Sequence, residues 1–129
     1  MVIRLFHLGD YKAVSVIFEN TSLTEDKFSF SRNFSWDGDL VMVALLNNII
    51  VGVIVGTIQQ KIGICYRIAV EENYRNIGIG KSLVLSLVKC FHARNVFTIG
   101  IALDNVNNKI NKFYELLGFC EEDYIKMRV

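Results

Sequence analysis

The stretch that decides the fold runs from Ile68 to Ser82 and reads I-A-V-E-E-N-Y-R-N-I-G-I-G-K-S. It leads from an apolar strand through a short polar loop into Gly78-Ile79-Gly80, where a helical pattern begins. The start of a helix has free backbone N–H groups and the positive end of the helix dipole, and the two glycines leave these groups open. The stretch therefore predicts a site for a small anion, most often a phosphate.

Three phosphate-binding patterns compete for these glycines, and two of them fail. A P-loop requires G-x-x-x-x-G-K-[ST]; Gly80-Lys81-Ser82 supplies its end, but its first glycine would fall on Arg75. A dinucleotide fingerprint requires G-x-G-x-x-G, but its third glycine would fall on Leu83. The third pattern, R-x-x-G-x-G, fits completely from Arg75 to Gly80.

Strand-like and helix-like patterns alternate along the rest of the chain, which predicts an α/β or α+β fold with a mixed sheet. Asp10 is expected to cap the first helix, and Asn47-Asn48 predicts a tight hairpin turn. From Lys61 to Val70 the apolar alternation predicts that even-numbered side chains share one side of the sheet. The predicted strands cover about 2–6, 40–46, 49–58, 61–70, 96–103 and 124–129, and the predicted helices begin near 10, 24, 80 and 107.

Length and composition predict one domain spanning residues 1–129. No linker, repeat or low-complexity segment marks a boundary, and 52% of the residues are apolar, so the chain should fold. The net charge of +1 gives no broad electrostatic case for binding nucleic acid or a membrane surface. Whether the protein forms a homodimer stays open at this stage.

The cysteines and the apolar segments argue against several other classes. Cys65, Cys90 and Cys120 are odd in number and lack metal-ligand spacing, so neither a disulfide framework nor a metal site is expected. The amino terminus lacks the apolar region of a secretory signal, and the longest apolar run, 49–58, is too short to span a bilayer. A cytoplasmic protein is therefore expected.

The R-x-x-G-x-G segment and its surroundings resemble the GNAT superfamily of acyl-CoA-dependent N-acetyltransferases. The apolar I-A-V directly precedes the loop, and N-x-x-x-x-x-F-Y-E-x-x-G-F, from Asn107 to Phe119, resembles the second signature of that family. The resemblance covers essentially the whole chain. It implies a mostly antiparallel sheet of six to seven strands, flanked by about four helices, with a gap between the fourth and fifth strands.

The resemblance also implies acetyl-CoA as the cosubstrate, with no metal. Backbone groups of the strand before the loop would pair with the pantetheine arm, and the amides from Asn76 to Lys81 would hold the pyrophosphate, with Arg75 shaping the loop. Asn107 resembles an asparagine that bonds the cofactor. The implied cofactor-binding residues are Ile68, Ala69, Val70, Arg75, Asn76, Ile77, Gly78, Ile79, Gly80, Lys81, Ser82, Asn107 and Tyr114.

The implied reaction is direct transfer of the acetyl group to a primary amine of a small molecule or protein. In the family, the tyrosine that matches Tyr114 protonates the leaving thiolate, and a strand amide, here that of Val70, meets the negative oxygen that develops. The family's acceptor groove would be lined by residues 18–39 and the carboxyl-terminal strand.

The general base is where the chain departs from the family. Relatives often place a glutamate on the fourth or fifth strand, where this chain has Ile64 and Ala102. The nearest remaining carboxylates are Glu71 and Asp104, each able to act only through a water molecule, and Glu71 is taken as the candidate base. A non-catalytic acyl-CoA sensor and a nucleotide-binding module stay open as alternatives.

Overall fold

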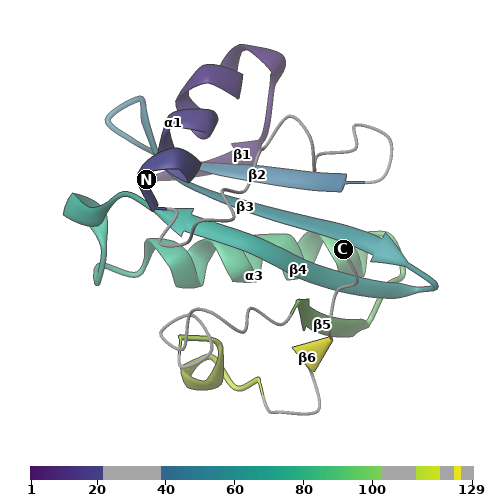
Figure 1. The fold of residues 1–129 in the computed structure, drawn as a ribbon. Coiled ribbons are helices and arrows are strands. Elements are labelled where there is room, and N and C mark those ends of the chain that lie inside the picture. The colour runs from purple at the N-terminus through teal and green to yellow at the C-terminus, as the bar shows by residue number, and fades with distance from the viewer. Residues whose placement is uncertain (22–38, 103–112, 120–123, 126–129) are drawn as a thin grey trace.

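The computed structural model describes residues 1–21, 39–102, 113–119 and 124–125 of the chain. Within these residues six strands form one sheet in the order β1-β2-β3-β4-β5-β6 (Figure 1). Neighbours are antiparallel from β1 to β4 and parallel from β4 to β6, which confirms the mixed, mostly antiparallel sheet. The strands are β1 (Val2–Leu5), β2 (Asp39–Leu46), β3 (Ile49–Gln59), β4 (Ile62–Val70), β5 (Thr98–Ala102) and β6 (Tyr124–Ile125).

Two tight turns connect the three central strands. Asn47 and Asn48, between β2 and β3, have φ angles of 52° and 65°, as the sequence predicts. Gln60 and Lys61, between β3 and β4, have φ angles of 50° and 66°. Positive φ at both central residues matches the twist of the flanking strands, so both hairpins close without a longer loop.

Helix α3 (Ile79–Ala93) packs closely on one face of the sheet because glycines on the strands leave room for it. A Cβ atom at Gly56 would lie 2.7 Å from Leu87 Cδ2, and one at Gly63 would lie 2.5 Å from Phe91 Cδ2. Such distances are far inside van der Waals contact, so any larger residue would push the helix away from the sheet. The largest buried cluster of apolar residues lies at this interface.

Helix α1 (Tyr11–Thr21) covers the opposite face of the sheet (Figure 1). Its residues Val14, Ile17 and Phe18 are fully buried at helical spacing, which gives the helix one apolar face. They form a second buried cluster with strand residues on this face, among them Val55 and Ala69. The central strands are therefore sandwiched between two helices.

A β-bulge in β4 changes which side chains face which helix. Val55 pairs with Arg67 and the next residue of β3, Gly56, pairs with Cys65, so Tyr66 is an extra residue without a partner. Cys65, before the bulge, and Ile68, after it, consequently both pack into the cluster against α3. The prediction that even-numbered side chains of this strand share one side is wrong, because one extra residue shifts the alternation.

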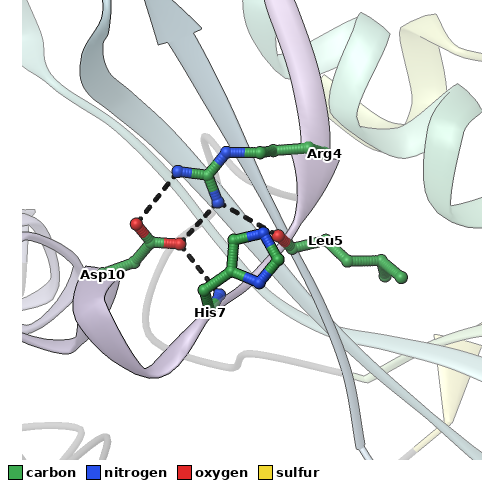
Figure 2. A network of polar contacts seen from close by, with 4 residues as sticks. All are labelled: Arg4, Leu5, His7 and Asp10. Carbon is green, nitrogen blue, oxygen red and sulfur yellow. Dashed lines mark hydrogen bonds and ion pairs between the residues drawn. The ribbon is translucent and has the colours of Figure 1, made fainter.

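A bidentate ion pair ties β1 to the start of α1 (Figure 2). Arg4 Nη1 and Nη2 donate to the two carboxylate oxygens of Asp10 at 2.7 and 3.0 Å, and the His7 N–H donates to Oδ2 at 2.9 Å. Asp10 ends the short helical turn η1 (Leu8–Asp10) directly before α1. The carboxylate that we expected to cap the helix thus reaches back to the strand, and its bond from the His7 N–H closes a capping box at the start of η1.

The hydrogen bonds from Arg4 are the largest cause that lowers the pKa of Asp10, and burial opposes them. A lowered pKa means that the ionised carboxylate stabilises the fold above its unfolded pKa and that this stabilisation is lost as the pH falls through the folded pKa. Because Arg4 keeps 33% of its side chain exposed, solvent screens the pair.

Asp10→Asn is therefore expected to lower the free energy of unfolding by about 1 kcal/mol at pH 7. The difference from the wild type should shrink at pH values below about 4, where Asp10 becomes protonated in the unfolded chain. Urea denaturation over this pH range measures both effects. Glu19→Gln, at an exposed position of α1, is the control and should lack this dependence. An equal loss at pH 3 and pH 7 would contradict the assigned role.

Candidate active site

Strand β4 has one open edge over its second half. It pairs with β3 along its length, but its pairing with β5 covers only Ile62 to Cys65, opposite Thr98 to Ile101. Figure 1 shows β4 continuing well past the end of β5. Among the described residues, therefore, no strand pairs with the far side of β4 after the bulge.

The backbone of Ile68 and Val70 points to this open edge. The Glu71 N–H donates to the Val51 carbonyl on β3 at 2.9 Å, and the C=O of the same peptide, that of Val70, points the opposite way. Because the direction alternates along a strand, Ile68 shares the orientation of Val70, whereas Ala69 faces β3. The N–H groups of Ile68 and Val70 are thus available for a ligand that lies along β4.

Ala69 has a different position from its two neighbours. Its backbone belongs to the ladder with β3, and its carbonyl lies 3.5 Å from the place where a Cβ atom of Gly52 would be. Its side chain is buried in the cluster on the α1 face. Of the three strand residues expected to bind the cofactor, Ile68 and Val70 have the suitable backbone direction.

Arg75 fixes the loop that leaves β4. Its Nε donates to the Val70 carbonyl at 2.9 Å, while the short turn η2 (Glu72–Tyr74) closes with a hydrogen bond from the Tyr74 N–H to the Glu71 carbonyl at 2.9 Å. The peptide between Val70 and Glu71 is consequently held on both sides, by Arg75 and by β3. This geometry fits the loop-shaping role expected of Arg75.

The start of α3 presents the backbone donors that an anion needs. Gly78 precedes the helix with φ 89°, and Asn76 has φ 65°, so the loop turns sharply before the first helical residue. The first bond of this helix runs from the Ser82 N–H to the Gly78 carbonyl at 3.1 Å. The N–H groups of residues 79–81 precede it and lack a partner within the helix. They are the candidate anion site, while the Ser82 N–H is already used.

The side chains around this site differ in exposure. Asn76, Ile77 and Lys81 are exposed, whereas Ile79 is buried in the core beneath α3. The loop therefore offers an anion mainly backbone groups, with Lys81 as the cation of the first helical turn.

The second signature packs directly on the first. A Cβ atom at Gly80 would lie 3.1 Å from the ring of Phe113, so the glycine is the residue that lets this ring approach the helix start. Phe113 contacts Tyr114 edge-on at 5.2 Å between ring centroids, and Tyr114 contacts Phe119 at 5.9 Å. Residues far apart in the sequence thus form one aromatic group beside the anion site.

The helical segment that carries Tyr114 ends at Gly118. Gly118 has φ 101°, and the N–H groups of Gly118 and Phe119 donate to the carbonyls of Glu115 and Tyr114 at 3.0 and 3.1 Å. These two bonds form a Schellman motif, in which glycine takes the left-handed position. The motif folds Phe119 back onto Tyr114.

The two residues predicted to take part in catalysis lie in different surroundings. Tyr114 is 2% exposed and belongs to the apolar cluster on the α3 face. Glu71 is half-buried and directly follows Val70 at the end of the open edge. Three predicted features lie outside the described residues: Asn107, the alternative base Asp104 and most of the predicted acceptor region.

Two further observations concern ionisable groups. Burial raises the pKa of the Cys65 thiol to about 12, so this cysteine stays protonated at neutral pH and supplies no thiolate. In the described part of the chain, no three His, Cys, Asp or Glu side chains are grouped in a way that could hold a metal ion.

Comparison with known proteins assigns the chain to a family. Residues 37–121 match the acetyltransferase (GNAT) domain family. An acetyltransferase from Pectobacterium atrosepticum is 29% identical over 131 residues, covering 98% of this chain and 93% of the relative. The chain therefore belongs to the GNAT acetyltransferase family, which confirms the resemblance seen in the sequence.

Solved structures share the fold. A ribosomal-protein-alanine N-acetyltransferase from Brucella melitensis superposes with a TM-score of 0.80 at 18% identity, covering 100% of this chain and 99% of that chain. An aminoglycoside N-acetyltransferase in complex with CoA gives a TM-score of 0.79 at 14% identity, covering 99% and 98%. Separately, none of the helices in the described ranges is both long enough and apolar enough to cross a membrane.

Sequence reasoning missed two features of this region. One is the position of Arg67, and the other is the contact between Phe113 and Gly80. The guanidinium carbon of Arg67 lies 5.7 Å from the centroid of the Phe18 ring, on the α1 face of the sheet. Regular alternation along β4 would have placed Arg67 on the same face as Cys65, but the bulge at Tyr66, which is not visible in the sequence, places them on opposite faces. The glycine pattern identified Gly80 as a site residue, but it did not predict that the ring of Phe113 packs against this glycine.

The contact between Gly80 and Phe113 can be tested by a double-mutant cycle. Gly80→Ala should be less favourable in the wild type than in a Phe113→Ala background by about 1 kcal/mol, because only the wild type holds a ring against the new methyl group. Urea denaturation of the four proteins measures this coupling. Gly9→Ala is the control, since a Cβ atom there would meet nothing within 4 Å. Additive effects of Gly80→Ala and Phe113→Ala would show that the two positions do not interact.

Proposed function

We propose that the protein transfers the acetyl group of acetyl-CoA to a primary amine of a small molecule or protein, by direct attack in a ternary complex. The observation that carries this proposal is the continuity between the open edge of β4 and the anion site at residues 79–81. A pantetheine arm could pair with the backbone of Ile68 and Val70 while the pyrophosphate binds the helix start.

In the proposed reaction the nitrogen of a neutral amine forms a bond to the thioester carbonyl carbon, and the carbon–sulfur bond breaks. The Val70 N–H, which points to the open edge, would stabilise the negative charge that develops on the carbonyl oxygen. Glu71 would accept the ammonium proton through a water molecule, and Tyr114 would donate a proton to the leaving thiolate. Arg75 contributes by holding the carbonyl of Val70 and thereby the end of the strand.

Family membership and the fold support this proposal, and so does the solved relative that binds CoA. The names of the structural neighbours include aminoglycoside and ribosomal-protein acetyltransferases, so both small molecules and proteins serve as acceptors in this fold. We further propose that residues 1–129 form a single domain, that the reaction needs no metal, and that the protein is cytoplasmic.

A non-catalytic acyl-CoA sensor is the second candidate. It is favoured by one observation: the strand position where relatives often carry a glutamate is occupied by Ile64, which is 3% exposed and cannot take up a proton. A sensor would use the same cofactor site without Tyr114 or Glu71 taking part in chemistry.

A thermal shift comparison tests the cofactor site. Acetyl-CoA and CoA, each at about one hundred times its Kd, should add about 2.7 kcal/mol to the stability and raise Tm by several degrees. ATP with magnesium should give no comparable shift, because the P-loop pattern is incomplete at Arg75. Gly78→Ala should reduce the shift, since a side chain is strained at φ 89°. The absence of a shift with both CoA species would overturn the cofactor assignment.

Replacing the proposed acid separates the enzyme from the sensor. Tyr114→Phe keeps the buried ring and removes the hydroxyl, so it should lower kcat by about 10²- to 10⁴-fold, the usual contribution of a general acid. Thiol release with a panel of amines measures turnover, and the acetyl-CoA thermal shift shows whether the cofactor site survives. Unchanged turnover would exclude an essential acid role. No turnover by the wild type with any amine, despite a clear shift, would favour the sensor.

A further inference from the structure

The segment around helix α3 carries a local positive charge that the small net charge of the chain hides. The sequence contains no acidic residue between Glu72 and Asp104. The basic residues of this segment are Arg75, Lys81, Lys89 and Arg94. Because the whole chain has a net charge of only +1, the residues outside the segment are net negative. Positive charge concentrated on one element in this way favours binding of an acidic partner.

Two of these charges lie on the side of α3 that faces away from the sheet. Lys81, Leu85 and Lys89 are spaced four residues apart, so they lie along one side of the helix in successive turns. Both lysines are exposed, and Leu85 is 52% exposed. The buried residues of the helix, among them Leu83 and Leu87, lie on the side that packs against the sheet. We call the side with the three exposed residues the outer face of α3.

An exposed aromatic ring extends the outer face beyond the last turn of the helix. His92 follows Leu85 by seven residues, which is close to two full turns, so it lies on the same side. The ring of Phe97 stacks on His92 at 5.1 Å between centroids and is largely exposed. Apolar side chains bordered by charged ones are typical of surfaces that bind another protein.

The charges of the outer face are not neutralised within the described part of the protein. Neither Lys81 nor Lys89 has an ion pair or hydrogen bond from its ammonium group to any described residue. The guanidinium of Arg4, in contrast, is paired with Asp10. An acidic partner could therefore bind the two lysines without displacing an internal ion pair.

The two lysines are too far apart to serve one small anion. Lys81 lies in the first turn of α3, beside the N–H groups of residues 79–81. Eight residues of helix place Lys89 about 12 Å further along the axis. The Debye length at physiological salt is about 8 Å, so a phosphate at the helix start is largely screened from Lys89. A ligand that uses Lys89 must therefore extend along the helix.

The position of the outer face indicates what kind of partner this is. Helices α1 and α3 cover opposite faces of the sheet (Figure 1), and only α3 begins at the candidate anion site. A partner on the outer face therefore lies on the side of the phosphate of the acyl donor. A second copy of this chain would bring lysines against lysines, which is unfavourable.

An acyl-phosphopantetheine arm can be attached either to a nucleotide, as in CoA, or to a serine of a carrier protein. We propose, on the basis of the acyl transfer proposed above, that the protein also accepts its acyl group from an acidic carrier protein that docks on the outer face of α3. Only this form of the donor has a protein surface that can cover the helix. The carrier is thus a partner and a second donor for the same site.

Each part of the outer face has a role in this complex. Acidic side chains of the carrier pair with Lys81 and Lys89, and an apolar side chain packs on Leu85. The phosphodiester of the arm binds the N–H groups of residues 79–81, and the thioester lies along the open edge of β4. The amine nitrogen bonds to the thioester carbonyl carbon, the carbon–sulfur bond breaks, and the thiol remains on the arm of the carrier.

The experiment compares acetyl-CoA with a discrete acyl carrier protein that carries acetyl-phosphopantetheine, using thiol release with a panel of amines. Lys89→Glu should lower kcat/KM for the loaded carrier by about 3- to 30-fold, because it replaces an attraction by a repulsion. It should leave kcat/KM for acetyl-CoA and the acetyl-CoA thermal shift unchanged. Lys89→Gln should show a smaller loss with the same selectivity, and it decides if Lys89→Glu does not fold.

The matched control is Lys12→Glu, which makes the same change of charge on α1, on the other face of the sheet. Lys12 is exposed and likewise has no ion pair with any described residue. The control should react with the loaded carrier as the wild type does. Equal losses in Lys12→Glu and Lys89→Glu would reveal an effect of net charge alone and would overturn the inference.

The carrier itself supplies the other decisive results. A loaded carrier with a kcat/KM no higher than that of acetyl-pantetheine would show that its protein surface adds nothing. If no amine reacts, binding of the carrier without its arm, measured by fluorescence anisotropy, decides: weakening by Lys89→Glu alone supports the inference, and unchanged binding contradicts it. Lys89-dependent binding to vesicles of phosphatidylcholine and phosphatidylglycerol, without binding of the carrier, would assign the face to a lipid surface instead. Failure of acetyl-CoA to stabilise the wild type would overturn the proposed function itself.

Discussion

The site depends on one constraint: β4 must stay rigid while half of one edge is left unpaired. An unpaired strand edge is normally a weak part of a sheet, because its N–H and C=O groups have no fixed partners. Here β3 holds the strand along its whole length, and the glycines at Gly56 and Gly63 let α3 press against it. The open backbone groups therefore keep a fixed position before any ligand binds, which reduces the cost of ordering them.

The end of this strand is secured by a separate set of contacts. Arg75 binds the carbonyl of Val70 from the loop, and the N–H of the same peptide binds Val51. Beyond the loop, Phe113 lies against Gly80, so the second family signature supports the first. The two motifs are about thirty residues apart in the sequence, yet each limits how the other can move. The helix start that is the candidate anion site is thus supported by Phe113 and does not rest on the loop alone.

Local patterns in the sequence predicted most of the fold and the start of the helix at which we propose that an anion binds. Asn47-Asn48 predicted a turn because the tolerance of positive φ is a property of the residue itself. The glycines around Ile79 likewise indicated the helix start. These features depend on a few neighbouring residues, which a single sequence contains.

The features that the sequence could not predict all depend on contacts between distant segments. The bulge at Tyr66 depends on how β3 and β4 pair, and the face of Arg67 depends on the bulge. Asp10 was expected to cap its own helix, but the guanidinium of Arg4 on a neighbouring strand offered a bidentate partner. Nothing in the local pattern distinguishes these outcomes, so the orientation of the charged residues near the site needed the structure.

The strand after the bulge also restricts how the chain can change over evolutionary time. Removing Tyr66 would leave both faces of β4 unchanged, because Cys65 and Arg67 already face opposite sides and pair with consecutive residues of β3. Removing one residue between Arg67 and Val70 would instead exchange the faces of part of the strand or leave its end one residue short of the Arg75 contact. Divergence from Arg67 to Arg75 should therefore proceed by substitution.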